Sequence, residues 1–124
     1  MTSIAFRMQL KPGAVEEYRR RHDAIWPELV SVLREAGIYD YSIFLDPESL
    51  NLFAVLKLAP THRRDSLPAN PVLQRWWTYM ADLMVTRDEG NERDGRDEGD
   101  ESDAGKKASV RPKEWPLELM FHMD

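Results

Sequence analysis

The sequence contains no cysteine, which excludes disulfide bonds, thiolate metal sites and cysteine nucleophiles. It also lacks any apolar run of about 18 residues, so no transmembrane helix is predicted. The first ten residues alternate in the manner of a strand and do not resemble a signal peptide. We therefore expect a soluble, cytoplasmic protein that does not act at a membrane.

Basic residues are also outnumbered by acidic ones. The formal net charge is -5, which argues against a nucleic-acid-binding surface. Residues 87–107 hold nine acidic and five basic residues, four glycines and no large apolar residue. Such a segment cannot bury enough surface to offset the entropy lost on ordering. We predict a single domain over residues 1–124 that contains a disordered or mobile acidic loop at about 87–112.

Apolar periodicity predicts the element order β-α-β-β-α-β. A period of two runs through residues 4–10, 39–45, 50–58 and 115–123, and each of these segments predicts a strand. Residues 14–36 have a helical pattern that Pro27 should kink or divide, and a second helix should run from Pro71 to about residue 84. Residues 60–70 are expected to form an irregular connection.

This order is that of the α+β, ferredoxin-like βαββαβ fold, in which a four-stranded antiparallel sheet carries its helices on one face. Two helices cover only that face, yet Phe44, Phe53, Val55 and Met120 would make the opposite face apolar. An exposed apolar face of this size usually marks a partner. We therefore predict a homodimer that forms through the open face of the sheet.

A histidine lies within the apolar stripe of the first helical segment. Tyr18 and His22 are one turn apart, on the same face as Ile25 and Leu29, so His22 should point toward the sheet. Spacing alone favours a core histidine with satisfied hydrogen bonds. The alternative is an acid/base group, because histidine titrates nearest to neutral pH. The neighbouring basic triplet, residues 19–21, is expected to be a solvated helix face.

Two adjacent tryptophans, Trp76 and Trp77, lie on the second predicted helix. They are either a core aromatic with an amphipathic neighbour, or a platform for a sugar, whose C–H faces pack on aromatic rings. Spacing does not separate these interpretations. The three histidines, His22, His62 and His122, lie on separate elements, so no metal site is predicted.

Three segments together resemble the L-rhamnose mutarotase family. Residues 18–29 read YRRRHDAIWPEL, close to the family pattern Y-x-x-R-H-x-x-I-W-P-E-L. Residues 39–45 read YDYSIFL, similar to its strand with a substrate-facing tyrosine. Residues 74–80 read QRWWTYM, similar to its R-W-W-x-Y-M. The likeness covers about residues 3–84 and 114–123. Residues 62–70 depart from it, because they replace an expected short helix, and the acidic segment is longer than the family's usual connection.

The resemblance implies a dimeric isomerase, without cofactor or metal, that interconverts the α and β anomers of L-rhamnose. By the same resemblance, His22 matches the position of the proton donor. Tyr18, Tyr41, Trp76 and Trp77 match positions that bind the sugar substrate. Tyr41 also lies on the odd-numbered face of its predicted strand, which agrees with a position inside the fold.

Two other functions remain open from the sequence. Cofactor-free or haem-dependent monooxygenases use the same dimeric ferredoxin-like fold, and a lone histidine could ligate haem. A non-catalytic sugar-binding or regulatory module could use the tryptophans without any acid/base step. Fold alone does not distinguish these functions from an isomerase.

Overall fold

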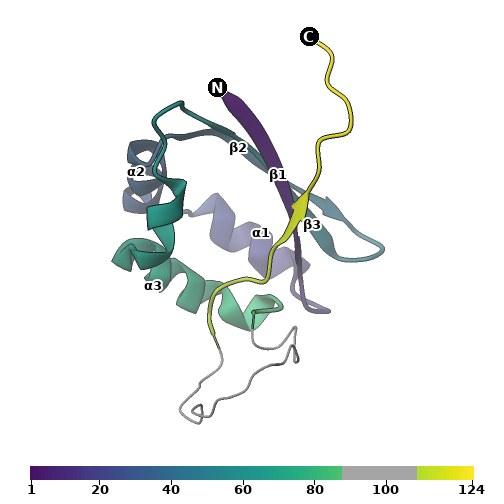
Figure 1. Ribbon diagram of the computed structural model, residues 1–124. Coiled ribbons are helices and arrows are strands. Elements are labelled where there is room, and N and C mark those ends of the chain that lie inside the picture. The colour runs from purple at the N-terminus through teal and green to yellow at the C-terminus, as the bar shows by residue number, and fades with distance from the viewer. Residues whose placement is uncertain (88–108) are drawn as a thin grey trace, which may run out of the picture.

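The structure, a computed structural model, describes residues 1–87 and 109–124 (Figure 1). β1 (Thr2–Gln9), α1 (Val15–Asp23), α2 (Pro27–Glu35), β2 (Ile38–Asp46) and β3 (Asn51–Leu58) form the first part of the chain. The 3-10 helix η1 (Arg64–Ala69), α3 (Pro71–Met80), the short 3-10 helix η2 (Ala81–Leu83) and β4 (Trp115–Leu117) follow. This order confirms the predicted βαββαβ pattern.

The four strands form one antiparallel sheet in the order β2-β3-β1-β4, and Figure 1 shows the helices together on one side of it. In the register of β1 with β3, Phe6 pairs with Ala54 and Met8 pairs with Leu52. All four side chains are at most 5% exposed, so the even-numbered residues of both strands form the sheet side of the core. No helix among the described residues is long and apolar enough to span a membrane.

The first helical segment is divided at Pro27. α1 ends at Asp23, and α2 begins at Pro27 after Trp26, whose backbone is extended. Proline inside a helix removes a hydrogen bond and clashes with the preceding turn, whereas the first helical position tolerates it. The division still leaves Leu29 facing the sheet at 2% exposure.

The connection before α3 is more regular than the sequence predicted. Residues 64–69 form a 3-10 helix, so the expectations of an irregular connection and of a missing short helix were both wrong. Pro68 fits within it because the fixed backbone angle of proline is also that of a 3-10 turn. Asn70 then caps α3, since its side-chain oxygen accepts the N–H groups of Val72 and Leu73 at 2.9 and 3.3 Å.

A β-bulge interrupts the pairing of β2 with β3. Tyr39 opposes Lys57 and Ser42 opposes Val55, so three steps along β2 match two steps along β3. Asp40 within this stretch has a φ of 53°, the left-handed region that a bulged residue can adopt.

The bulge changes which side chains face the helices. Ile38 and Tyr41 both line the space between sheet and helices, although strict alternation would put residues three apart on opposite faces. Tyr39, which lies opposite the exposed Lys57, is 39% exposed. Simple alternation therefore placed Tyr41 correctly but missed the extra residue between Tyr39 and Ser42, and Tyr39 itself also borders the cavity.

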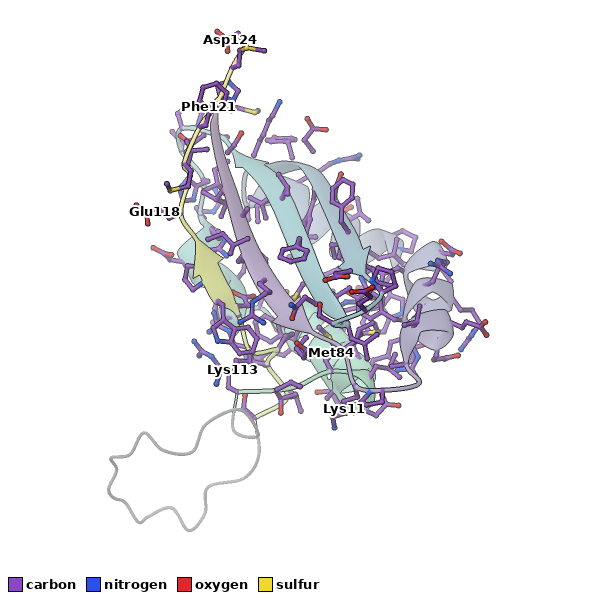
Figure 2. The ribbon with its side chains drawn as sticks, turned by 90° about the vertical axis from the view of Figure 1, so that its right-hand side faces the viewer. Lys11, Met84, Lys113, Glu118, Phe121 and Asp124 are labelled. Carbon is purple, nitrogen blue, oxygen red and sulfur yellow. The ribbon has the colours of Figure 1, made fainter. Side chains whose placement is uncertain are left out.

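The last strand is shorter than predicted. β4 ends at Leu117, so the expectation of a strand up to residue 123 was wrong. Residues 118–124, here called the C-terminal tail, extend away from the body of the molecule (Figure 2). Their apolar side chains are 73–84% exposed: Leu119, Met120, Phe121 and Met123. The alternation that predicted a strand thus has no packing surface within the described part of the chain.

The face of the sheet opposite the helices is apolar, as predicted. Phe44 pairs with Phe53 across β2 and β3, and the exposed fractions of Phe44, Val55 and Leu117 are 61%, 40% and 41%. We refer to these four residues as the open face. Met120, which the sequence assigned to this face, belongs instead to the tail.

The predicted acidic loop at about 87–112 falls mainly on residues 88–108, which lie outside the described residues. Both of its flanks are held by the fold. The N–H of Arg87 donates to the carbonyl of Arg111 at 3.0 Å, and Thr86 pairs with Pro112. Residues 86–87 and 111–112 therefore lie side by side.

Candidate active site

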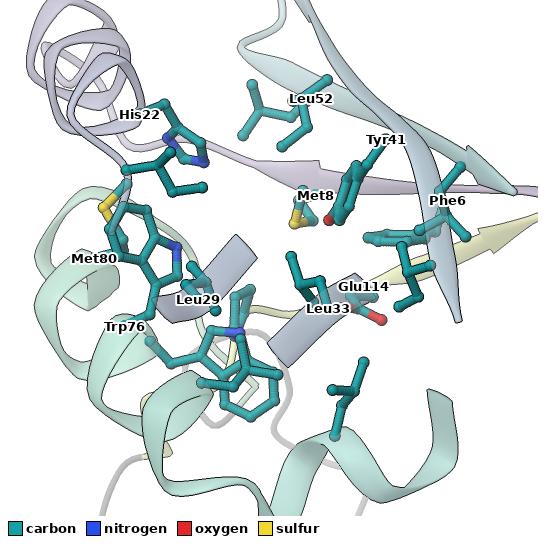
Figure 3. A pocket seen from close by; sticks show the side chains of 18 of the residues that line it. Phe6, Met8, His22, Leu29, Leu33, Tyr41, Leu52, Trp76, Met80 and Glu114 are labelled. Carbon is teal, nitrogen blue, oxygen red and sulfur yellow. The ribbon is translucent and has the colours of Figure 1, made fainter. Parts of the chain in front are cut away.

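A cavity of about 960 Å³ lies between the helices and the sheet (Figure 3). Its size is within the range of small-molecule sites in proteins. The structure brings together all five residues that the sequence singled out, because each of them lines this cavity: Tyr18, His22, Tyr41, Trp76 and Trp77. Their roles in binding and catalysis remain predictions.

His22 lies between two aromatic rings, 4.3 Å from the ring centre of Tyr18 and 5.3 Å from that of Trp76. Its Nδ1 is 3.2 Å from the Tyr18 carbonyl oxygen. A carbonyl can only accept, so Nδ1 carries a proton and Nε2 is the nitrogen that can exchange one with a ligand. Burial lowers the pKa of His22, opposed by the Tyr18 hydrogen bond and the charge of Asp23, so the ring is mainly neutral at pH 7.

Two tyrosines supply hydroxyl groups to the cavity. Tyr18 is 8% exposed, whereas Tyr41 is 39% exposed, and Figure 3 shows the Tyr41 hydroxyl pointing inward. Burial raises the pKa of both phenols, and the charge of Glu114 raises that of Tyr41 further. Both tyrosines are therefore neutral at physiological pH and can donate and accept hydrogen bonds with sugar hydroxyls.

The two tryptophans differ in burial. Trp76 is 6% exposed and makes an edge contact with Trp26 at 5.0 Å, so it is the member of the pair on the buried stripe. Trp77 is half-buried, and the Arg111 guanidinium lies 5.4 Å from its ring centre. The core interpretation is confirmed for Trp76, whereas the sugar platform stays a prediction for two residues that both line the cavity.

A charged group that sequence reasoning missed completes the wall. Glu114 precedes β4, and its Oε1 lies 3.8 Å from Nη2 of Arg64. Burial raises the pKa of Glu114, while the charges of Arg64 and Arg111 oppose that rise. The alternation of residues 115–123 would have grouped Glu114 with Met120 on the face predicted to be open, so its inward position comes only from the pairing of Trp115 with Arg7.

The fold and the cavity define a class of protein: a ferredoxin-like α+β domain with an aromatic-walled site that carries an imidazole and neutral hydroxyls. Such a site suits acid/base chemistry on a small polyhydroxylated ligand. The family model for L-rhamnose mutarotase matches residues 3–123, and this chain belongs to that family.

Individual relatives agree with the family match. The L-rhamnose mutarotase of Sinorhizobium fredii is 61% identical over 123 residues, 99% of each chain. That of Burkholderia cenocepacia is 50% identical over 124 residues, 100% of each chain. The crystal structure of an L-rhamnose mutarotase from Formosa agariphila superposes over the whole of both chains with a TM-score of 0.78 at 31% identity.

Proposed function

We propose that this protein is an isomerase that interconverts the α and β anomers of L-rhamnose, with His22 as its acid/base residue. The observation that carries the proposal is the orientation of His22, whose Nδ1 is held by the Tyr18 carbonyl while its ring borders the cavity. Membership in the L-rhamnose mutarotase family supports the choice of sugar. The family match does not favour the monooxygenase alternative.

The reaction needs one proton delivered to the ring oxygen and one removed from the anomeric hydroxyl. Protonated His22 donates from Nε2 to the ring oxygen as the bond from that oxygen to the anomeric carbon breaks and a carbonyl forms. A water molecule in the cavity takes the anomeric proton. Rotation about the bond between the first two carbons then presents the other face of the carbonyl. On closure the hydroxyl that re-forms the ring returns its proton to His22, and the water returns its proton to the carbonyl oxygen, which becomes the new anomeric hydroxyl. The protein and the water are therefore unchanged after each turnover.

The remaining residues would hold the sugar during ring opening. The neutral hydroxyls of Tyr18 and Tyr41 are suited to bind sugar hydroxyls, since each can both donate and accept. Trp76 and Trp77 offer apolar surfaces to the C–H groups of the ring and to the methyl group of L-rhamnose. A lowered pKa makes the His22 imidazolium a stronger acid, which favours donation to a weakly basic ring oxygen.

Anomer exchange measured by NMR saturation transfer tests the proposal. We expect wild-type protein to exchange the α and β signals of L-rhamnose faster than buffer does, and His22→Ala to reduce this exchange by roughly 100-fold or more. His122→Ala is the matched control, because His122 lies in the exposed C-terminal tail. Full exchange by His22→Ala would exclude His22 as the acid/base residue, and no exchange by wild type would exclude the activity.

We also propose that the chain forms a homodimer through the open face. Helices cover only the other side of the sheet, and the open face presents Phe44, Val55 and Leu117 to solvent. The C-terminal tail directly follows β4 and adds four exposed apolar side chains. A second copy is the occupant that these features favour, because two identical apolar faces can cover each other about a twofold axis. The cytoplasmic location stays a prediction.

A further inference from the structure

We infer that Glu114, paired with Arg64, is a specificity-determining residue that accepts hydrogen bonds from sugar hydroxyls at the end of the cavity remote from His22. The inference rests on the proposed function and adds to it the part of the sugar that the cavity recognises. The ligand class it defines is a sugar with adjacent hydroxyls opposite its anomeric carbon.

The position of Glu114 follows from β4. Trp115 pairs with Arg7, and the Arg7 guanidinium lies 4.0 Å from the Trp115 ring centre, so both side chains share the face away from the helices. Glu114 is one residue earlier and therefore points toward the helices, where it lines the cavity. Its side chain is 25% exposed. Glu114 is thus within reach of a ligand but largely removed from bulk water.

The pair with Arg64 does not satisfy the carboxylate. The Nη2–Oε1 distance of 3.8 Å is an electrostatic contact and exceeds hydrogen-bond length. Each carboxylate oxygen can accept two hydrogen bonds, so Glu114 retains acceptor capacity toward the cavity. Two neighbouring hydroxyls on a sugar ring present two donors at a spacing that one carboxylate can meet.

Glu114 lies on the side of the cavity opposite His22. Figure 3 shows His22 beside Trp76 at one end and Glu114 below Tyr41 at the other. In a six-membered sugar ring, the ring oxygen and the anomeric carbon are neighbours, and the third and fourth carbons lie opposite them. With His22 at the ring oxygen, Glu114 meets the hydroxyls on those two carbons and takes no part in proton transfer at the anomeric centre.

The charge of the group also sets the ligand class. A hydrogen bond to a carboxylate is stronger than one between neutral groups, and a sugar lacking the partner hydroxyl would leave this buried charge with an unmet acceptor. The ligand that Glu114 favours is therefore a sugar that presents hydroxyl donors at this end of the cavity, where Arg64 and Arg111 balance the charge of the carboxylate.

Kinetics of anomer exchange with Glu114→Gln test the inference. We expect KM for L-rhamnose to rise about tenfold while kcat stays within about threefold, since one charge-assisted hydrogen bond is lost and proton transfer is not. Glu118→Gln makes the same chemical change at an exposed carboxylate beyond β4, and its KM should equal that of wild type. L-rhamnose analogues lacking the hydroxyl at the third or fourth carbon should lose about tenfold in kcat/KM with wild type and less than about threefold with Glu114→Gln.

A pH profile provides a second variant and a second readout. In wild type, KM should rise as pH falls and Glu114 becomes protonated, and this rise should be absent from Glu114→Gln. In Arg64→Met the rise should move to higher pH, because loss of the cation raises the Glu114 pKa.

The outcomes separate the two proposals. No exchange by wild type would refute the proposed function. Exchange by wild type would overturn the role of Glu114 alone if KM were unchanged in Glu114→Gln, or if wild type and Glu114→Gln discriminated equally against the analogues. A fall in kcat with unchanged KM would also overturn it, because it would assign Glu114 to proton transfer.

Discussion

At the scale of single residues, the hydrogen bond between His22 and the Tyr18 carbonyl determines which ring nitrogen can meet the sugar. The bond gives Nδ1 the hydrogen-bond partner that a buried histidine requires, and it leaves Nε2 as the nitrogen that can exchange a proton with the ligand. The sequence predicted the direction of His22 correctly because helical spacing is a local property. It could not choose between a core histidine and an acid/base group, since that depends on whether distant segments leave a cavity beside the ring.

The titration of His22 gives a prediction at this scale. Burial disfavours the imidazolium, so its pKa should lie below the ordinary value of 6.5 and the neutral ring should carry its proton on Nδ1. Because the unfolded chain then binds more protons, the free energy of unfolding should fall as pH drops below 6.5. Nitrogen-detected NMR of the histidine rings measures both the pKa and the tautomer. A pKa above 6.5, or a proton on Nε2 in the neutral ring, would contradict the geometry.

At the scale of secondary-structure elements, Arg21 joins α1 to the end of α3. Its guanidinium donates to the Glu17 carboxylate, to the Tyr79 carbonyl at 2.6 Å and to Asp82 at 3.0 Å. The side chain is 13% exposed, so the expectation that the whole basic triplet would be a solvated helix face was wrong at Arg21. The tertiary contact was not visible in the sequence, because its partners are 58 and 61 residues away.

Arg21→Met tests this contact. Losing hydrogen bonds from a largely buried guanidinium should cost about 1 kcal/mol, which corresponds to a Tm lower by roughly 3–6 °C. Hydrogen bonds from Arg20 and Arg21 lower the pKa of Glu17 to about 2, so wild type should lose stability as pH falls from 4.5 toward 2.

In Arg21→Met this acid-dependent loss should be smaller, because Glu17 keeps only Arg20 as a partner. Thermal unfolding at pH 7 and across the acid range measures both effects. Arg19→Met is the matched control, since Arg19 is exposed on the same helix. Equal Tm values for the two variants would show that the contact does not stabilise the fold.

The same local-versus-distant distinction explains the other elements. The starts of α2 and α3 could be predicted from Pro27 and Asn70, because helix capping and the steric effect of proline act within a few residues. The bulge in β2 depends on the register against β3, and the inward position of Glu114 depends on how β4 meets β1. Neither strand pairing can be predicted from a short stretch of sequence. The sequence therefore predicted neither the bulge between Tyr39 and Ser42 nor the position of Glu114 in the cavity wall.

At the scale of the whole molecule, the most exposed apolar side chains of the described residues gather on the open face and the C-terminal tail, apart from Met1. The helices bury the inner face of the sheet, whereas the open face and the C-terminal tail leave Phe44, Leu119 and Phe121 at 61%, 73% and 79% exposure. The alternation of apolar residues predicted an apolar open face correctly, because successive side chains of a strand point to opposite faces of the sheet. It could not predict that the tail would leave the sheet.

Sedimentation velocity tests the homodimer. Wild type should sediment as a species of twice the 14.5 kDa chain mass, and Phe44→Lys should weaken association by roughly 10-fold or more, because it brings two charges into the apolar contact. Glu48→Lys, in the turn between β2 and β3, is the control for added charge. A wild type that stays monomeric at all concentrations would refute the dimer, and a dimeric Phe44→Lys would place the interface elsewhere.

The bulge at Asp40 has a consequence for how this sheet can grow. β2 is an edge strand, and an edge of regular, unpaired backbone can recruit strands from other molecules and seed fibrils. Here a left-handed residue and an ion pair from Asp40 to Lys57 break the regularity of that edge, while β4, at the other edge, is only three residues long. Lateral strand addition is therefore disfavoured at both edges, and the surface left for the proposed association of two copies is the open face of the sheet.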